Sequence, residues 1–246
     1  MIKVIDCDTP IYVDRIFCIN LEKDVERKKE MIERLNIFNL TDKVEFVKGS
    51  YNKLKPTIGC RTSHFRIIKK AYQEKINNIM ILEDDCEFNE FPFKIDDNIP
   101  KDWDMIYPGY LDVDLRSFKY SENLVKLKSG RSTYCYILNI KSYPYILRMI
   151  GCNQHIDVFY SDIIQNSMNC YGLYPVKAFQ SFNKSNISGR FNKNVNDRII
   201  KNSEIVYNKE KPKKEENKWY NHYKNFMKKF NNNYDLDINL LVRLDF

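Results

Sequence analysis

Short apolar runs alternate with helical patterns over the first ninety residues. Residues 16–19 and 79–82 are apolar, residues 44–47 are apolar except for Glu45, and all three segments carry β-branched side chains, which is typical of buried strands. The segments that follow Asn20 and Gly59 carry apolar residues at helical spacing. A strand–helix–strand–helix–strand order builds a parallel sheet through crossover connections. The pattern therefore predicts an α/β fold with a mainly parallel central sheet flanked by helices.

The middle of the chain continues the alternation less regularly. Residues 103–107 and 133–138 have the apolar character of further strands, and residues 173–179 return to an extended pattern. Residues 141–150 and 157–166 have helical spacing. Hydrophobic residues make up 43% of the 246 residues, which is enough for one large folded domain.

The character of the chain changes near residue 200. We expect a folded domain over residues 1–200 and a lysine-rich helical extension over residues 201–246. The extension carries an aromatic stripe at spacings of four, three and four residues, formed by Trp219, Tyr223, Phe226 and Phe230. Such a helix can dock on its own domain, form a homodimer or lie on a membrane surface, and the sequence leaves these three open.

Charge and cysteine usage narrow the class of protein. The net charge of +7 favours an anionic partner, but no nucleic-acid-binding module is recognisable, so we expect no nucleic-acid partner. The N-terminus lacks a signal-peptide pattern and no apolar run is long enough to span a membrane, so we expect a cytoplasmic protein. The seven cysteines are scattered without a Cys-x-x-Cys pair, which argues against a disulfide framework or a zinc cluster and favours free thiols.

Three consecutive acids, Glu83, Asp84 and Asp85, directly follow the apolar strand at residues 79–82. Ligands of open parallel sheets bind outside the carboxyl ends of the strands, where this acid triplet lies. Two carboxylates about 4 Å apart repel by roughly 1 kcal/mol even in water, so a cation or a proton is needed nearby. Mg²⁺ or Mn²⁺ shared with substrate phosphates is the natural partner. The alternative is a solvated loop whose acids face water.

Three stretches of the chain belong together: "FCINLEKDVERKKEM" (17–31), "GCRTSHFRIIKKAYQEKINNIMILEDDCEF" (59–88), and "HIDVFYSDII" followed by "YPVKAFQSFNKSNI". In combination they resemble glycosyltransferase family 25, which includes lipo-oligosaccharide and procollagen galactosyltransferases. The resemblance covers roughly residues 16–190. Two departures from the family pattern are His155-Ile156 in place of Pro-Val and Asn186 in place of Asp.

The resemblance implies a GT-A fold, with a Rossmann-like sheet, over residues 1–200. It implies an enzyme that moves a hexose from UDP-galactose or UDP-glucose to a hydroxyl of a glycan or of collagen-type hydroxylysine. Mn²⁺ or Mg²⁺ is the implied cofactor, and inversion at the anomeric carbon is the outcome regarded as general in the family. A metal that bridges both phosphates would stabilise the charge of the leaving diphosphate.

The same resemblance assigns residues to the donor site. Asp85 and Glu83 would hold the metal, with Glu83 and Asp84 also available to the ribose. Arg27 would pair with a diphosphate oxygen or brace the nucleotide, or else be an ordinary charge on a helix surface. The other donor-site candidates are Asn20, Leu21, Ser63 and His64. Asn20 is equally a helix cap, and His64 equally a buried structural histidine.

Asp157 is the candidate general base for the acceptor hydroxyl, because it matches the aspartate of the family's Pro-Val-Asp motif. Its alternative role is the N-cap of a helix over residues 158–166. Two other functions remain open. A metal-dependent phosphohydrolase would place a nucleophilic Asp-x-Asp near the first strand, which this sequence lacks there. A catalytically inactive GT-A domain that only binds glycans would keep the fold without the turnover.

Overall fold

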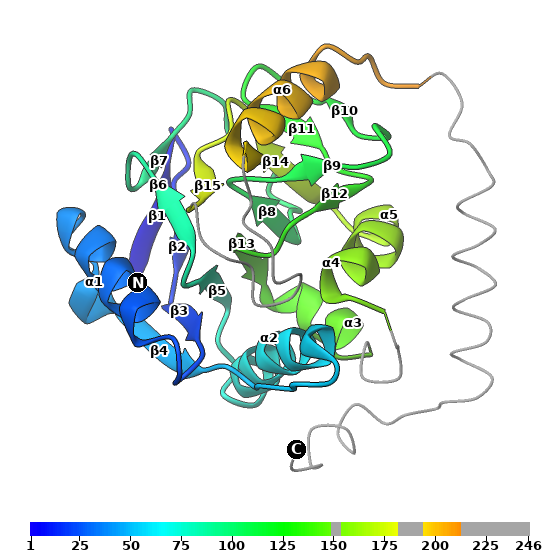
Figure 1. The fold of residues 1–246 in the computed structure, drawn as a ribbon. Coiled ribbons are helices and arrows are strands. Elements are labelled where there is room, and N and C mark those ends of the chain that lie inside the picture. The colour runs from blue at the N-terminus through cyan, green and yellow to red at the C-terminus, as the bar shows by residue number, and fades with distance from the viewer. Residues whose placement is uncertain (149–153, 182–193, 213–246) are drawn as a thin grey trace.

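The computed structural model describes residues 1–148, 154–181 and 194–212. Its centre is an eight-stranded sheet with the strand order β10-β11-β14-β8-β13-β5-β3-β4 (Figure 1). The strands in chain order are β3 (Arg15–Asn20), β4 (Val44–Lys48), β5 (Asn78–Glu83), β8 (Met105–Tyr107), β10 (Phe118–Lys119), β11 (Leu124–Lys126), β13 (Cys135–Asn139) and β14 (Cys170–Leu173).

The first half of this sheet has the predicted crossover arrangement. β3 is parallel to both β4 and β5, and the connections run through α1 (Val25–Ile37) and α2 (Pro56–Gln73). In the strand order β5-β3-β4, the connection from β3 to β4 and the connection from β4 back to β5 run in opposite directions along the sheet. Right-handed connections therefore place α1 and α2 on opposite faces of the sheet. The carboxyl ends of β3, β4 and β5 therefore meet at one edge.

The sheet as a whole is mixed, with β13 and β11 reversed, while its other six strands run in one direction as the prediction of a mainly parallel sheet requires. β13 lies between β5 and β8 and is antiparallel to both, while β14 is parallel to β8 and antiparallel to β11. β10 and β11 are also antiparallel. Apolar periodicity marks a buried strand but carries no information about its direction, so this half of the sheet could not be ordered from the sequence. The α/β class itself is confirmed.

Short helices cover the part of the sheet next to α2. The predicted helix at 157–166 is a continuous helical run made of α4 (Ile156–Phe159), a π-helical turn (Tyr160–Ile164) and α5 (Gln165–Ser167). The one predicted at 141–150 is a 3₁₀ turn (Ile140–Ser142) followed by α3 (Tyr143–Leu147). α2 packs against both α3 and α4.

Smaller sheets flank the central one. β1 (Ile2–Asp6) pairs with β2 (Ile11–Val13) and with β7 (Phe93–Lys94). β9 (Leu111–Asp112) pairs with β12 (Gly130–Arg131). β6 (Cys86–Phe88), which follows the acid triplet, pairs with β15 (Ala178–Gln180), so the chain near residue 180 lies beside the triplet.

The last described helix, α6 (Val195–Tyr207), packs on β9, β10 and β15 (Figure 1, orange). It buries Ile199, Ser203 and Val206. Residue 200, the predicted end of the first domain, therefore lies inside a helix. The aromatic stripe at residues 219–230 is outside the described residues, and the division of the chain at residue 200 stays a prediction.

Two further predictions concern membrane spans and cysteines. Over the described residues, every helix is too short or too polar to cross a membrane. The six cysteines at described positions are free thiols, namely Cys7, Cys18, Cys60, Cys86, Cys135 and Cys170.

Candidate functional site

The acid triplet begins at the carboxyl end of β5, beside the end of its parallel neighbour β3. The backbone N–H of Asp84 donates to the carbonyl of Ile19 at 3.1 Å, and that of Glu83 donates to the carbonyl of Tyr134 at 2.9 Å. The backbone of the triplet is thus held between β3 and the approach to β13. Its three side chains then make separate sets of contacts.

Asp84 is fixed by residues from the first strand and helix. Its Oδ2 accepts a hydrogen bond from Asn20 Nδ2 at 2.7 Å, and its Oδ1 forms a close ion pair with Arg27. Burial, which leaves Asp84 5% exposed, raises the pKa of its carboxyl to about 6, and Arg27 opposes this effect. Both oxygens of Asp84 already have partners.

Asp85 has one oxygen with a partner and one without. Its Oδ2 lies 3.2 Å from Arg27 Nη2, whereas its buried Oδ1 has no hydrogen-bond partner. Burial, reinforced by the charge of Glu83, raises the pKa of Asp85 to about 7. One guanidinium thus serves two buried carboxylates, and the unpartnered Oδ1 fits a bound cation.

Glu83 makes its contacts on the side of α2 and β13. Its Oε1 accepts a hydrogen bond from Thr133 Oγ1 at 2.6 Å and lies 3.4 Å from His64 Nε2. Burial acts to raise the pKa of Glu83, but the interactions with His64 and Thr133 outweigh burial and lower it. Glu83 is therefore a carboxylate that is ionised in the folded protein.

Ser63 and His64 lie in the middle of α2, not at its N-terminus, since the helix begins at Pro56. Ser63 Oγ accepts a hydrogen bond from the backbone N–H of Ser50 at 2.8 Å and donates to the carbonyl of Gly59 at 2.9 Å. His64 is 1% exposed, and its Nδ1 is hydrogen-bonded to the Tyr136 hydroxyl at 2.7 Å. Ser63 thus holds the loop after β4, and His64 has the burial expected of a structural histidine.

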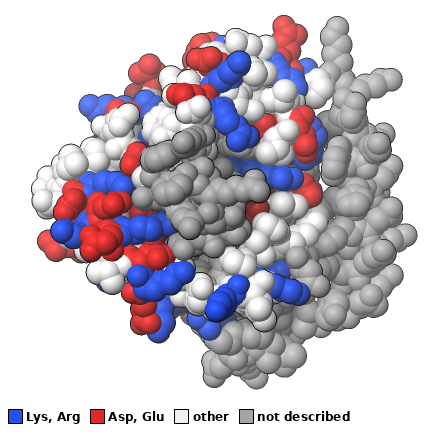
Figure 2. Space-filling view, viewed as in Figure 1, with Lys and Arg blue, Asp and Glu red and all other residues white. Residues whose placement is uncertain are grey.

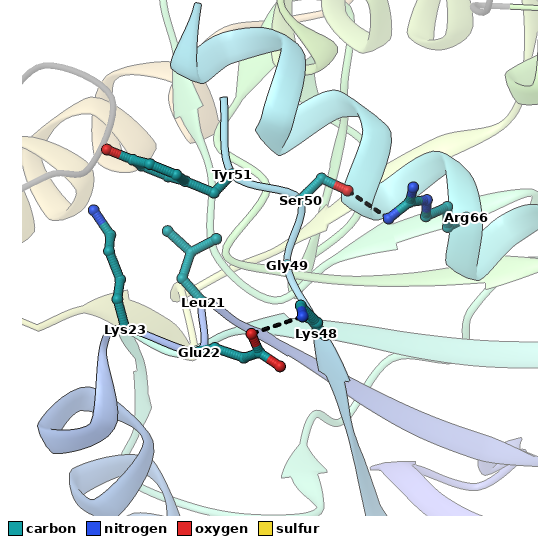
Figure 3. Close-up of a pocket in the computed structure, with 8 residues that line it drawn as sticks. All are labelled: Leu21, Glu22, Lys23, Lys48, Gly49, Ser50, Tyr51 and Arg66. Carbon is teal, nitrogen blue, oxygen red and sulfur yellow. Dashed lines mark hydrogen bonds and ion pairs between the residues drawn. The ribbon is translucent and has the colours of Figure 1, made fainter. Parts of the chain in front are cut away.

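A pocket of about 480 Å³ opens at the carboxyl ends of β3 and β4 (Figure 3). Lys23 Nζ lies 4.2 Å from the centre of the Tyr51 ring, and Lys48 pairs with Glu22 at 2.6 Å. The lining residues are Leu21, Glu22, Lys23, Lys48, Gly49, Ser50, Tyr51 and Arg66. Leu21 was predicted as a donor-site residue, and the others were missed. Except for Arg66, which lies on α2, they stand at or directly after the ends of the first two strands, and that position was the available signal.

Three alternatives for the predicted residues are decided by these contacts. Arg27 is not an ordinary surface charge, because its side chain is 15% exposed and pairs with two aspartates. Asn20 is not the cap of α1, because Asp24 occupies the N-cap position, and Asn20 Nδ2 donates both to Asp84 and to the carbonyl of Asp24. Asp157 is not an N-cap, because it lies in the first turn of α4, whose N-cap is His155. Its carboxylate accepts a hydrogen bond from the N–H of Val158 at 2.8 Å.

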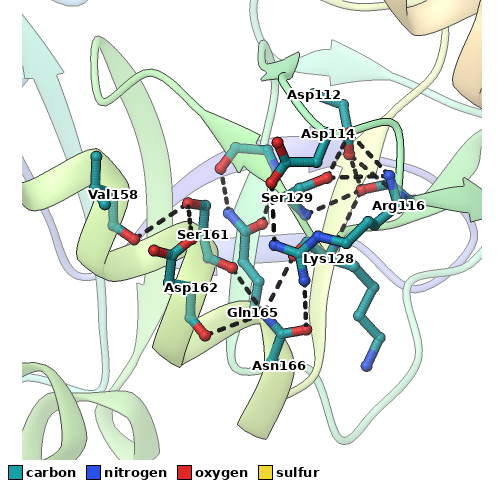
Figure 4. A network of polar contacts seen from close by, with 12 residues as sticks. Asp112, Asp114, Arg116, Lys128, Ser129, Val158, Ser161, Asp162, Gln165 and Asn166 are labelled. Carbon is teal, nitrogen blue, oxygen red and sulfur yellow. Dashed lines mark hydrogen bonds and ion pairs between the residues drawn. The ribbon is translucent and has the colours of Figure 1, made fainter. Parts of the chain in front are cut away.

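A further buried acid, Asp112, belongs to a separate polar network (Figure 4). It is 1% exposed, and its carboxylate accepts hydrogen bonds from the hydroxyls of Ser117 and Ser129 and from the backbone N–H of Arg116. Gln165, in the same region, exchanges two hydrogen bonds with the backbone of Gly130. With both oxygens engaged inside the fold, Asp112 has a structural role.

Taken together, the contacts unite Asn20, Arg27, Asp84 and Asp85 in one cluster, with Glu83 and His64 beside it. An acid cluster and a basic pocket at the carboxyl edge of parallel strands define the class of α/β proteins that bind their ligands at that edge. Within this class, the family model described as "Glycosyltransferase family 25 (LPS biosynthesis protein)" matches residues 54–127. That range contains Ser63, His64 and the whole acid triplet.

A curated relative from Anopheles gambiae named "Glycosyltransferase 25 family member" is 25% identical over 170 residues. The match covers 55% of this chain and 29% of the mosquito protein, so the chain spans less than a third of that relative's length. The two matches support the assignment of the chain to glycosyltransferase family 25, the family that the motifs predicted.

Solved structures resemble the chain only distantly. A glycosyltransferase involved in glycosylation of the major capsid of PBCV-1 gives a TM-score of 0.36 at 8% identity, covering 56% of this chain and 67% of that one. A mutant of Drosophila β-1,4-galactosyltransferase 7, complexed with manganese, UDP-Gal and xylobiose, gives 0.40 at 10% identity, covering 82% and 81%.

Proposed function

We propose that the protein is a metal-dependent glycosyltransferase that moves a hexose from a UDP-sugar, UDP-galactose or UDP-glucose, to a hydroxyl of an acceptor. The observation that carries this proposal is the unpartnered, buried Oδ1 of Asp85 beside the other carboxylates of the triplet. A hard divalent cation such as Mn²⁺ or Mg²⁺ is the partner that such an oxygen lacks. The family assignment supports the same chemistry.

Asp85 would hold the metal through Oδ1, with Glu83 as the second carboxylate of the acid-x-acid spacing. The ion would bind the diphosphate of the donor and stabilise the charge of the leaving UDP. Arg27 and Asn20 occupy both oxygens of Asp84, so their role is to hold the aspartates in place. Asp84 thereby supports the metal site through its contacts with Arg27 and Asn20.

The pocket beside the triplet is the proposed place of the nucleotide. Lys23, Lys48 and Arg66 line it with positive charge, and Tyr51 offers an aromatic ring to a base. Ser63 shapes the pocket indirectly, because it bonds the backbone of Ser50. Asp157 remains the proposed general base, and the proposed acceptors are a glycan or a collagen-type hydroxylysine.

The proposal is tested by UDP release from UDP-galactose and UDP-glucose across a Mn²⁺ and Mg²⁺ titration, with and without a panel of sugar acceptors. Asp85→Ala should abolish metal-dependent turnover while circular dichroism stays unchanged. Asp42→Ala is the matched control, since Asp42 is an exposed acid at the opposite end of β4. Activity of Asp85→Ala within threefold of wild type would exclude Asp85 as the metal ligand.

A further inference from the structure

A second group of metal-ligating atoms combines Glu83 of the acid triplet with two residues of α2. Cys60 and His64 stand one turn apart on α2, and Glu83 faces them from the end of β5. The thiol of Cys60, a ring nitrogen of His64 and a carboxylate oxygen of Glu83 all lie within 4.8 Å of one another. The cysteine spacing gave no sign of this group, because its members come from two elements that meet only in the fold.

The orientation of His64 points to a ligand. Its Nε2 is buried, has no partner at hydrogen-bond geometry, and lies 3.4 Å from Glu83 Oε1. Two ligands at about 2.0–2.1 Å from one tetrahedral zinc ion are separated by roughly 3.4 Å. The histidine nitrogen and the carboxylate oxygen thus already have the spacing of two ligands of a single ion.

Both ligands have partners that fix their orientation. His64 Nδ1 is hydrogen-bonded to the Tyr136 hydroxyl at 2.7 Å, and Thr133 Oγ1 donates to Glu83 at 2.6 Å. When Nδ1–H donates to the Tyr136 oxygen, Nε2 directs its lone pair towards Glu83. Metal-binding histidines are typically oriented in this way through their second ring nitrogen.

Charge and ligand type select the ion. A thiolate, a neutral imidazole and a carboxylate carry two negative charges, which one divalent cation neutralises. Without a cation, burial together with the charges of Glu83 and Asp157 holds the pKa of the Cys60 thiol well above its usual value. A sulfur and a nitrogen ligand favour zinc over Mg²⁺ or Mn²⁺.

We propose that Cys60, His64 and Glu83 form a binding site for a thiophilic divalent ion of the zinc type. Three protein ligands leave one coordination position open for water or a ligand atom. On binding, the Cys60 thiol releases its proton to solvent and its sulfur bonds the metal. Glu83 belongs also to the proposed donor site, so the test centres on Cys60 and uses no activity measurement.

The test is a Co²⁺ titration of the full chain after chelator treatment, followed by absorption spectroscopy. A cysteine thiolate bound to Co²⁺ gives a ligand-to-metal charge-transfer band in the near ultraviolet. We expect this band to saturate at one equivalent and to disappear when Zn²⁺ is added. Cys60→Ala should abolish it, whereas Cys7→Ala should leave it unchanged, since Cys7 lies at the end of β1 and bonds Thr9.

Thr133→Val supplies a second variant that keeps all three ligands. Loss of a hydrogen bond to a metal ligand typically weakens metal binding about 10–100-fold. We expect that loss in the Co²⁺ affinity of Thr133→Val, so the site remains testable even if Cys60→Ala does not fold. Absence of the charge-transfer band in wild type, or its persistence in Cys60→Ala, would overturn the proposal.

Discussion

At the scale of single residues, one cationic side chain balances two buried carboxylates. Arg27 pairs with both Asp84 and Asp85, while Asn20 supplies Asp84 with a further hydrogen bond. Burial raises the pKa of Asp84 to about 6 and that of Asp85 to about 7. Each carboxylate would ionise near pH 3.9 in the unfolded chain. Ionisation of these two carboxylates therefore lowers the stability of the metal-free fold.

The first prediction concerns the pH dependence of stability with metal chelated. The folded pKa values lie above the unfolded ones, so the folded protein binds more protons between about pH 4 and pH 7. The contribution of these two groups to stability is thus greatest below about pH 4 and falls as the pH rises to about 7. In urea unfolding, the free energy of unfolding of Asp85→Asn relative to that of wild type should increase between pH 5.5 and pH 8, by on the order of a few kcal/mol.

Asp42→Asn serves as the control for this measurement, since it removes an exposed acid far from the triplet. Its free energy of unfolding should change between pH 5.5 and pH 8 by the same amount as that of wild type. A wild-type advantage over Asp85→Asn that grows with pH would contradict the assignment of raised pKa values.

The second prediction concerns Asp157. Asn at this position keeps the size of the side chain and its ability to accept from the N–H of Val158, but it cannot take a proton. Loss of a general base typically lowers the rate about 10²–10⁴-fold. We expect Asp157→Asn to bind UDP and Mn²⁺ as wild type does, to melt at nearly the same temperature and to lose transfer to an acceptor.

Asp162→Asn, on the same helical run, is the matched control and should transfer normally. Transfer by Asp157→Asn within tenfold of wild type would mean that the base is another group.

At the scale of elements, strand order was predicted correctly where the hydrophobic pattern of the strands and the length of the connecting helix indicate the same arrangement. β3, β4 and β5 were placed correctly as parallel strands because a helix of sufficient length joins each consecutive pair. β8 and β13 were recognised as extended but not ordered, since hydrophobic pattern does not give strand direction. Glu83 is bonded by Thr133 and His64 by Tyr136, and these two partners come from β13 or its approach. That half of the site could not be predicted without the position of β13.

The pocket shows the same limit. Leu21 was predicted, but Lys48, Tyr51 and Arg66 come from β4, its loop and α2, and only the fold brings them together. Single polar residues at strand ends are common, so no motif distinguished them. Asp84 and Arg27 were both named from the sequence, yet their mutual contact was not predicted, because 57 residues separate them along the chain.

A prediction at the element scale follows from Gly172 in β14. A Cβ at this position would lie 2.3 Å from a ring carbon of Tyr110, which is fully buried and so has little room to move. Overpacking of a core costs typically 1–3 kcal/mol. We expect Gly172→Ala to lower the free energy of unfolding by at least this amount, measured by urea denaturation.

Gly130→Ala is the comparison variant. Its Cβ would lie 3.2 Å from a methyl group of Leu127, which is the flexible end of a side chain. A cost clearly smaller than that of Gly172→Ala is expected, and equal costs in the two variants would contradict the steric explanation.

At the scale of the whole molecule, the last described helix is linked to the acid triplet. Asn196 of α6 exchanges two hydrogen bonds with the backbone of Gln180 in β15, at 3.1 and 3.0 Å. β15 pairs with β6, directly after the triplet, and the N–H of Ser181 donates to the carbonyl of Asp85 at 2.7 Å. α6 thus braces the strand that holds the backbone of Asp85, although more than 100 residues separate them along the chain.

This docking of α6 is tested with two neighbouring isoleucines. Ile199 is fully buried, whereas Ile200 is 42% exposed on the other side of the same helix. Replacing a buried isoleucine by alanine leaves a cavity and costs about 2–5 kcal/mol, while an exposed one loses much less. Helix propensity affects both changes alike, so the difference between Ile199→Ala and Ile200→Ala in urea unfolding of the full chain measures the docking itself. A difference below about 1 kcal/mol would show that α6 contributes little to the fold, and that the bracing of Asp85 by β15 does not depend on it.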